Sequence, residues 1–303
     1  MPEPARASPR VAVVVATNRG GPFLEEALRS VVAQTLTDWE LVVVDDGATD
    51  AGAVRRAVEA VGDARVRLLR IPASGVSRAR NHGVAQTSGA ILAFLDDDDR
   101  WDARRLELGI APFGDDAVVA TYCGLRTIDA DGVVLVQADQ VPVASGLDVA
   151  RGRGGILLPN LLLRRSALNE VGEFSPRLRM AEDLDLVLRL VAVGDFVLVP
   201  TSLVDYRHHA DNTTSRYRAL AVSIREIVRQ QRDAAKQAGD RELVVALRER
   251  DRANDRFAAW SAARSAREAL GARKLGSALG DVGWAATFAP WAPFLWLRRR
   301  LRG

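Results

Sequence analysis

Hydrophobic residues in the first hundred positions follow two alternating periodicities. Short, nearly continuous apolar runs are typical of strands buried on both faces of a parallel sheet. Between these runs, apolar residues recur every three or four positions, which predicts amphipathic helices. The predicted strands are 10–17, 39–46, 64–71 and 90–97, and the predicted helices are 22–35, 50–61 and 76–87. This order predicts right-handed crossovers and a ligand crevice at the carboxyl ends of the strands.

The pattern changes after residue 116. The predicted elements are a β-hairpin over 117–136, a glycine-rich loop over 151–155, a helix over 181–193, a short strand over 196–199, and helices from 216 to about 272. The glycine-rich loop is of the kind that can cover a ligand crevice as a lid. We therefore expect an α/β body over residues 1–215 and an α-helical C-terminal extension over residues 216–303.

The net charge changes sign between the predicted body and the predicted C-terminal extension. Residues 1–215 carry 23 basic and 30 acidic side chains, a net charge of −7, whereas residues 216–303 carry 19 and 9, a net charge of +10. The acidic body argues against nucleic acid as its ligand, because phosphates would meet net repulsion there. A single cysteine, Cys123, excludes an internal disulfide and a cysteine-based zinc cluster. With no secretion signal evident in residues 1–10, a cytoplasmic location is expected.

Polar clusters follow three of the predicted strands. They are Thr17-Asn18, Asp45-Asp46 and the run Asp96 to Asp99. Four adjacent carboxylates repel one another, and Mg²⁺ typically takes one or two protein carboxylates together with substrate phosphates. On an extended segment, Asp96 and Asp98 point the same way. The alternative is a solvated acidic turn at the start of a helix.

Other polar groups have both a chemical and a structural interpretation. Asp45 and Asp46 can accept hydrogen bonds from a nucleobase or ribose, or they can form an Asx turn. Asp183 and the neighbouring Glu182 lie at the start of a predicted helix, whose dipole favours ionised carboxylates. Such a carboxylate can serve as a general base, or it can simply be a charged residue at the helix N-terminus. His209 suits binding of a metal or a phosphate, or an ordinary role on the surface or in the core. The loop 17–21 has neither a dinucleotide-binding nor a P-loop signature.

Four segments, in order, together resemble the family 2 glycosyltransferases. They are 11–50, 74–99 with the four aspartates, 171–194 with the Glu-Asp pair, and 206–215 with the His-containing loop. The resemblance covers about residues 10–215. It implies a GT-A fold, which is a Rossmann-like α/β architecture with a mixed, mostly parallel sheet flanked by helices. It also implies a nucleotide-diphosphate sugar donor, Mg²⁺ or Mn²⁺, and inversion at the anomeric carbon.

The same resemblance implies roles for individual residues. The donor-binding residues would be Thr17, Asn18, Asp45, Asp46, Arg80, Asn81 and Asp96. Asp96 and Asp98 match the family's D-x-D motif, which reaches the diphosphate through the metal, and His209 would be near that metal. Asp183 matches the catalytic base, supported by Glu182. Asn18 stands where the family usually has an aromatic residue, so a stacking contact with the base is not expected there.

The C-terminal segment 282–297 is apolar, contains three tryptophans and runs into "RRRLRG". As a helix it would reach about 24 Å, short of the roughly 30 Å hydrocarbon core of a bilayer. Tryptophans beside arginines suit a membrane interface. We therefore expect residues 276–303 to contact the inner face of the plasma membrane peripherally. The alternatives are packing on the body or in a homodimer.

The sequence as a whole predicts a metal-dependent, inverting glycosyltransferase of bacterial surface polysaccharide or glycoconjugate synthesis. Its acceptor would be a glycan, a lipid-linked sugar or a small molecule. One alternative is a nucleotidyltransferase that makes nucleotide sugars, although "TNRGGPF" lacks the expected glycine- and lysine/arginine-rich signature loop. The other alternative is a non-catalytic scaffold that binds nucleotide sugars, which would have no need of Asp183 as a base.

Overall fold

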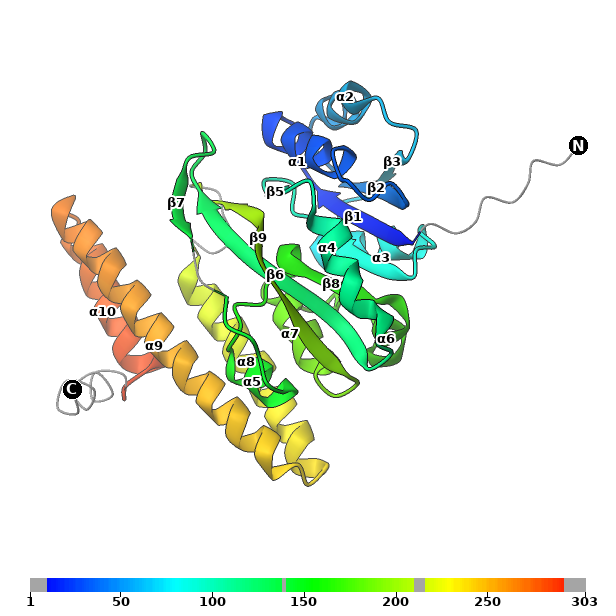
Figure 1. The fold of residues 1–303 in the computed structure, drawn as a ribbon. Helices are drawn as coiled ribbons and strands as arrows, with labels where there is room; N and C mark the ends of the chain where they lie inside the picture. Colours follow the sequence, from blue (N-terminus) through cyan, green and yellow to red (C-terminus); the bar gives the residue numbers. More distant parts are fainter. Residues whose placement is uncertain (1–9, 138–139, 210–215, 292–303) are drawn as a thin grey trace, which may run out of the picture. The chain divides into compact units, whose positions relative to one another are not determined.

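The computed structural model describes residues 10–137, 140–209 and 216–291 (Figure 1). The chain forms two compact units. Unit 1 comprises Met1–Val149 and Arg153–His209, and unit 2 comprises Ala150–Gly152 and Ala210–Gly303. Unit 1 contains the sheet, and unit 2 is built from helices.

A single mixed sheet of nine strands forms unit 1, in the order β3-β2-β1-β4-β8-β6-β9-β5, with β7 paired to β6. The pairs β3-β2, β2-β1, β1-β4 and β6-β9 are parallel, and they contain most of the paired residues. The strands are β1 (Val11–Thr17), β2 (Trp39–Asp46), β3 (Val66–Ile71), β4 (Ile91–Phe94), β5 (Arg100–Trp101), β6 (Val118–Ile128), β7 (Val134–Gln137), β8 (Leu161–Arg164) and β9 (Asp195–Arg207).

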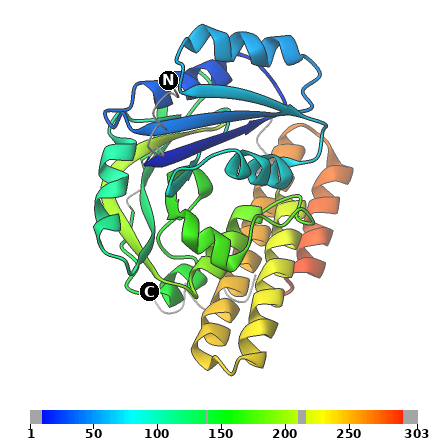
Figure 2. The same cartoon turned by 90° about the vertical axis from the view of Figure 1, so that its right-hand side faces the viewer.

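Helices connect the strands and cover both faces of the sheet (Figures 1 and 2). They are α1 (Pro22–Val32), α2 (Ala51–Val61), α3 (Val76–Ala85), α4 (Arg105–Ile110), α5 (Gly146–Arg151), α6 (Arg165–Val171) and α7 (Glu182–Leu190), with 3₁₀ turns at Ala111–Gly114 and Leu158–Asn160. The fold class expected from the sequence, a mixed and mostly parallel sheet flanked by helices with a helical extension, is confirmed.

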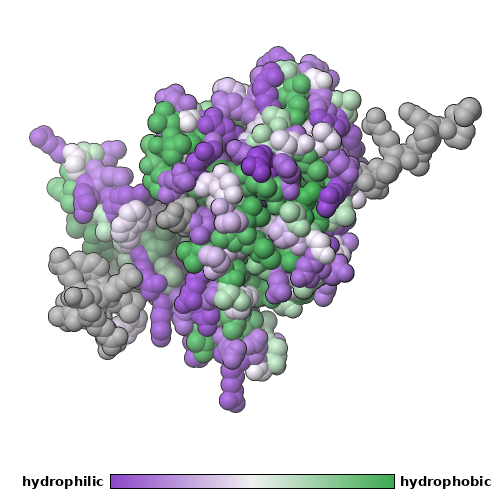
Figure 3. All heavy atoms as spheres, viewed as in Figure 1, coloured by the Kyte–Doolittle hydropathy of each residue, from purple (hydrophilic) through white to green (hydrophobic). Residues whose placement is uncertain are grey.

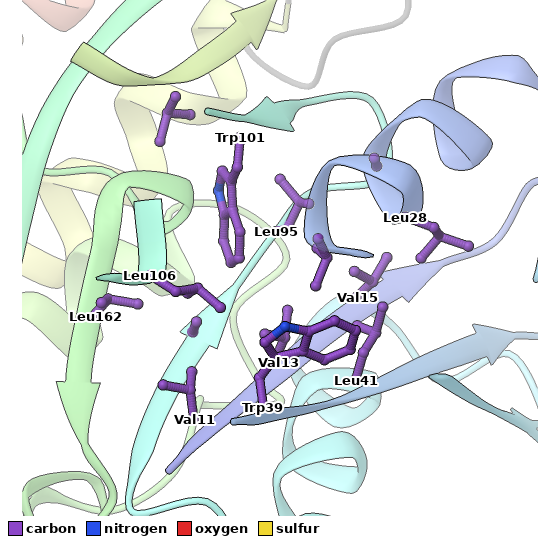
Figure 4. Close-up of a cluster of buried hydrophobic side chains, with 14 of the residues drawn as sticks. Val11, Val13, Val15, Leu28, Trp39, Leu41, Leu95, Trp101, Leu106 and Leu162 are labelled. Atoms are coloured by element: carbon purple, nitrogen blue, oxygen red, sulfur yellow. The ribbon is translucent and has the colours of Figure 1, made fainter. Parts of the chain in front are cut away.

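Alternation along the strands explains the two covered faces. Val13 of β1 and Leu41 of β2 pack with Leu28 of α1 in the cluster of Figure 4, and all three are fully buried. Residues one position further along the same strands point to the other face, where Val42 packs with Ala79 of α3. Because both faces are buried, the strands have no polar face, and this accounts for their nearly continuous apolar sequence.

Two predicted strands differ from the observed ones. The strand predicted over 90–97 ends at Phe94, and the aspartates that follow form a turn in which the Asp99 amide donates to the Asp96 carbonyl at 3.2 Å. The expectation that Asp96 and Asp98 lie on an extended segment is therefore wrong. The short strand predicted over 196–199 extends to Arg207, across a bulge opposite Gly124.

The glycine-rich segment contains less loop than the sequence indicated. Arg151 ends α5, a helix that no periodicity predicted. Gly152, Gly154 and Gly155 have φ values of +87°, +90° and +59°, a region that glycine adopts without strain. The hairpin β6–β7 turns at Gly132, as expected, and β7 exposes uncharged side chains where Figure 3 shows hydrophobic surface.

Unit 2 consists of α8 (Tyr217–Gln237), α9 (Arg241–Gly271) and α10 (Leu275–Phe288). The first two form a hairpin, and α10 packs along α9 through small residues that include Ala266 and Ala278 (Figures 1 and 2). Among the described residues, no helix has the length and apolar composition that crossing a bilayer requires. The predicted interface segment 276–303 is described only as far as Trp291.

Candidate functional site

The carboxyl ends of β1, β2 and β4 meet at one edge of the sheet, as the strand order requires. Thr17 ends β1, Asp46 ends β2, and the aspartates follow β4. The Thr17 hydroxyl oxygen lies 2.5 Å from Asp97 Oδ2, so the first and third of the predicted polar clusters touch directly. Asn18 is exposed beside them.

Asp45 and Asp46 hold the turns at the end of β2. Asp45 is 1% exposed; its carboxylate accepts hydrogen bonds from the Ala48 amide at 2.7 Å and from Arg70 Nη1 at 2.7 Å. Asp46 accepts from the amides of Ser74 at 2.6 Å and Gly75 at 2.8 Å, just before α3. Both carboxylates thus have a structural role, and their contact with a nucleotide stays a prediction.

Arg80 connects the acidic turn to the start of α7. From the buried face of α3, its Nη2 donates to Asp96 Oδ1 at 2.8 Å and its Nη1 donates to Glu182 Oε1 at 2.5 Å. The Arg80 side chain is 8% exposed. Burial disfavours its charge, but Asp96 and Glu182 outweigh burial and raise the pKa of Arg80. The guanidinium therefore fixes two predicted functional segments relative to each other.

Burial raises the pKa values of three carboxyl groups in the acidic turn. Burial raises the pKa of Asp96 to about 6; the Arg80 cation opposes this rise, and Asp98 adds to it. Burial raises the pKa of Asp97 as well, against the hydrogen bond from Thr17. Asp99 is fully buried beside them, and burial raises its pKa well above the usual range. Additional positive charge at this turn would stabilise the ionised forms.

Glu182 and Asp183 are the first residues of α7, and the residue before them has an unusual backbone conformation. Ala181, which precedes them, has φ +58°, in the left-handed region that costs a non-glycine residue about 1–3 kcal/mol. The Asp183 carboxylate accepts a hydrogen bond from the Leu184 amide at 2.7 Å. Its negative charge also contributes to the raised pKa of Arg80. The helix start therefore holds Glu182 on Arg80 with Asp183 next to it.

Asn81, next to Arg80 on α3, binds the segment that leads to α7. Its Nδ2 donates to the Phe174 carbonyl at 2.8 Å, and its Oδ1 accepts from the Phe174 amide at 3.0 Å. The Phe174 ring in turn packs edge-on against Phe94 at the end of β4, with 5.1 Å between centroids. The amide of Asn81 is engaged with protein backbone, which is a supporting role that the sequence did not indicate.

His209 joins the acidic turn from the end of β9. Its Nε2 lies 2.9 Å from Asp98 Oδ2, and its ring stacks on Phe23 of α1, with 5.6 Å between centroids. Two residues earlier, the Arg207 amide donates to Asp99 Oδ1 at 2.8 Å and the Arg207 Nε donates to the Asp98 carbonyl at 2.9 Å. Sequence reasoning missed Arg207 and Phe23, because only the tertiary fold brings α1 and β9 to the aspartates.

A divalent cation would find two suitable ligand atoms side by side. Asp98 Oδ2 and His209 Nε2 are 2.9 Å apart, close to the about 3 Å between neighbouring ligands of an octahedral ion with bonds of about 2.1 Å. Asp99 Oδ2 is buried without a hydrogen-bond partner. Within the described residues, no three His, Cys, Asp or Glu side chains are grouped to hold a metal. The residues fit an ion that takes one or two protein ligands and completes its shell with diphosphate and water.

Comparison with known proteins identifies the family of the chain. The family model described as glycosyl transferase family 2 matches residues 11–183, more than half of the chain. An uncharacterized glycosyltransferase of Rickettsia felis is 26% identical over 215 residues, covering 69% of this chain and 36% of that protein. The putative teichuronic acid biosynthesis glycosyltransferase TuaG of Bacillus subtilis is 26% identical over 188 residues, covering 61% of this chain and 73% of that protein. The chain spans about a third of the length of the first relatives it matches.

Two solved structures share the fold. S. aureus TarS residues 1–349 in complex with UDP-GlcNAc matches with a TM-score of 0.62 at 18% identity, covering 89% of each chain. The mannosyltransferase PcManGT from Pyrobaculum calidifontis, in complex with GDP-Man and Mn²⁺, matches with a TM-score of 0.61 at 22% identity, covering 98% of this chain and 81% of that chain. At these identities the likeness concerns the fold alone, and the expected GT-A fold is confirmed.

Proposed function

The chain belongs to glycosyl transferase family 2, and we propose that it transfers a sugar from a nucleotide-diphosphate sugar to an acceptor hydroxyl, with inversion, in the synthesis of a bacterial surface polysaccharide or glycoconjugate. The observation that carries this proposal is the bridge formed by Arg80 between Asp96 and Glu182. It holds the carboxylates for the diphosphate side of the reaction beside the carboxylates for the acceptor side. Residues 1–215 would be the catalytic domain and residues 216–303 its helical extension.

Asp98 and His209 would hold Mg²⁺ or Mn²⁺, with Asp96 toward the ribose and the metal. Bound there, the ion would offset the negative charge of the diphosphate as it leaves. The ion would also offset the part of the repulsion between the diphosphate and the aspartates that Arg19 and Arg80 leave uncompensated. Thr17, Asn18, Asp45, Asp46 and the surroundings of Arg80 and Asn81 would bind the rest of the donor.

Asp183 would take the proton of the acceptor hydroxyl as that oxygen attacks the anomeric carbon. General-base assistance typically contributes about 10²–10⁴-fold to a rate. Glu182 would act as a positioning residue, since its carboxylate is fixed by Arg80 at 2.5 Å. Attack from the face opposite the leaving diphosphate would invert the anomeric centre in a single displacement.

The test has a binding arm and a turnover arm. Calorimetric titration of UDP, GDP and dTDP, each with and without Mn²⁺, should show metal-dependent binding of at least one nucleotide, and Asp98→Ala should lose it. With the matching nucleotide sugar and a panel of glycan acceptors, Asp183→Asn should lose about 10²–10⁴-fold in turnover with donor affinity unchanged. Asp195→Asn, an exposed carboxylate at the start of β9, is the matched control.

Each other result has a definite meaning. Nucleotide binding with undiminished turnover in Asp183→Asn would refute the assignment of the base. Binding without turnover of any sugar would favour the non-catalytic scaffold. Formation of a nucleotide sugar from a sugar phosphate and a nucleoside triphosphate would favour the nucleotidyltransferase. Folded protein that binds no nucleotide would refute the proposed function.

We also propose that unit 2 contacts a membrane surface peripherally through α10. Leu275, Leu279 and Val282 lie four and three positions apart, on one helix face, and are 58–72% exposed. The only charged residue within α10 is Asp281, which is buried and paired with Arg218. An uncharged apolar helix face next to basic residues suits the interface of an anionic bilayer.

Co-sedimentation with vesicles tests this contact. The full chain should pellet with phosphatidylcholine vesicles that contain phosphatidylglycerol more than with phosphatidylcholine alone, and Leu279→Glu should reduce pelleting. Val245→Glu, at an apolar position of α9 that is 47% exposed, is the matched control. Equal pelleting of Leu279→Glu and wild type would refute the role of α10. A dimer seen by light scattering and lost in Leu279→Glu, without vesicle binding, would show that this face joins two copies.

A further inference from the structure

Arg19 places a positive charge where a metal ion is expected. Its Nη2 lies 2.7 Å from Asp98 Oδ2 and 3.1 Å from Asp97 Oδ1. Asp98 Oδ2 is the same oxygen that lies 2.9 Å from His209 Nε2. A cation that approaches this oxygen must therefore displace the guanidinium from it, or share the oxygen with it.

The loop after β1 fixes the backbone of Arg19 but leaves its side chain able to move. The Arg19 amide donates to the Thr17 hydroxyl oxygen at 3.1 Å, and the Arg19 carbonyl lies 2.6 Å from the same oxygen. The Arg19 side chain is 42% exposed, whereas those of Asp97 and Asp98 are 12% and 13% exposed. The guanidinium can thus leave the carboxylates by rotation of an exposed side chain, with no opening of the core.

Arg19 and Arg80 differ in this respect. Both donate to the acidic turn, but Arg80 is almost fully buried and also bound to Glu182. Arg80 must therefore stay in place, whereas Arg19 is held at its charged end by Asp97 and Asp98 and is otherwise half in solvent. A diphosphate offers a guanidinium two strong charge-assisted hydrogen bonds, comparable to those it makes with carboxylates. A donor that arrives at the turn competes for Arg19.

We propose that Arg19 is an exchangeable counterion, which occupies the metal-binding carboxylate of Asp98 until a nucleotide diphosphate draws it away and admits the metal. The proposal rests on the proposed function of this site. Its consequence is thermodynamic coupling: the nucleotide raises the affinity for the metal and, by linkage, the metal raises the affinity for the nucleotide by the same factor. A metal that also binds the diphosphate is coupled to the nucleotide in any case, so the exchange is identified by the part of the coupling that is lost when Arg19 is replaced.

Calorimetric titration of MnCl₂ into the full chain, with and without saturating UDP or GDP, measures the coupling directly. We expect Arg19→Gln to bind Mn²⁺ more tightly than wild type without nucleotide, by about fivefold or more, and to gain correspondingly less affinity when nucleotide is added. Arg19→Lys keeps the charge and should retain part of the coupling. Arg29→Gln removes an exposed arginine of α1 that pairs with Glu25, and should match wild type.

The outcomes separate this inference from the proposed function. If Arg19→Gln binds Mn²⁺ as wild type does in both states, while Asp98→Ala loses it, the exchange is refuted and the metal site stands. Weaker Mn²⁺ binding in Arg19→Gln without nucleotide also refutes exchange, because Arg19 would then support the site. If wild type binds no Mn²⁺ even with nucleotide, the exchange and the metal dependence fail together.

Discussion

Replacing Arg80 with methionine removes the cation shared by Asp96 and Glu182 and keeps a side chain of similar length. The Arg80 and Glu182 side chains are 8% and 12% exposed, so Glu182 would be left as a nearly buried, unpaired charge. Breaking a buried pair in this way costs about 3–5 kcal/mol. Asp96 adds little to that figure, because its carboxyl, whose pKa is already raised to about 6, can take up a proton when Arg80 is removed. We therefore expect a loss of about 3–5 kcal/mol from the free energy of unfolding at neutral pH.

Urea denaturation followed by circular dichroism measures this loss. Arg78→Met, on the exposed face of the same helix, is the control and should change stability by less than about 0.5 kcal/mol. In the double variant Arg80→Met/Glu182→Gln, much of the stability should return, because the uncompensated charge is gone. A loss below about 1 kcal/mol in Arg80→Met would refute the reasoning, since it would place the pair in the energetic range of a solvated surface salt bridge.

Three further predictions concern core packing, a hydrogen bond to the backbone and the reactivity of a buried thiol. Leu28→Ala, in the fully buried contact between α1 and the sheet, should cost about 2–5 kcal/mol in the same denaturation experiment, against near-neutral Val245→Ala. Asn81→Ala should cost about 1–3 kcal/mol, because it leaves the buried backbone groups of Phe174 unpaired; hydrogen exchange should show the Phe174 amide opening faster. Burial raises the pKa of the Cys123 thiol, so iodoacetamide should label it only in the unfolded chain at pH 8, as mass spectrometry would show; rapid labelling of folded protein would contradict its burial.

Much of the scaffold could be predicted from the sequence because its determinants are local. The apolar runs that became β1 and β2 are buried on both faces, and the periodic segment that became α1 presents Leu24, Leu28 and Val31 to the sheet. Parallel strand order then placed Thr17, Asp46 and the aspartates after Phe94 at one edge. That inference needed only the chirality of strand–helix–strand units, which is nearly universal.

Side-chain pairing within the site could not be predicted in the same way. Arg80 and Glu182 are 102 positions apart, and Asp98 and His209 are 111 apart, so no local pattern connects them. The run of aspartates also has a partner that only the tertiary fold provides: the Arg207 amide, 108 positions along the chain, donates to Asp99 Oδ1 at 2.8 Å.

The sequence by itself determined most of the elements, their order, and the arrival of Thr17, Asp46 and the aspartates at one edge of the sheet, because backbone propensity and hydrophobic period act over a few residues. Only the tertiary structure decided which of those polar residues are held in place by buried contacts and which have side chains that can change partners. Arg80 and Arg19 illustrate the difference: both donate to carboxylates of the acidic turn, yet Arg80 is enclosed between two elements and Arg19 is 42% exposed. Burial determines what it costs to move a charge, and burial is set by contacts between segments distant in the chain.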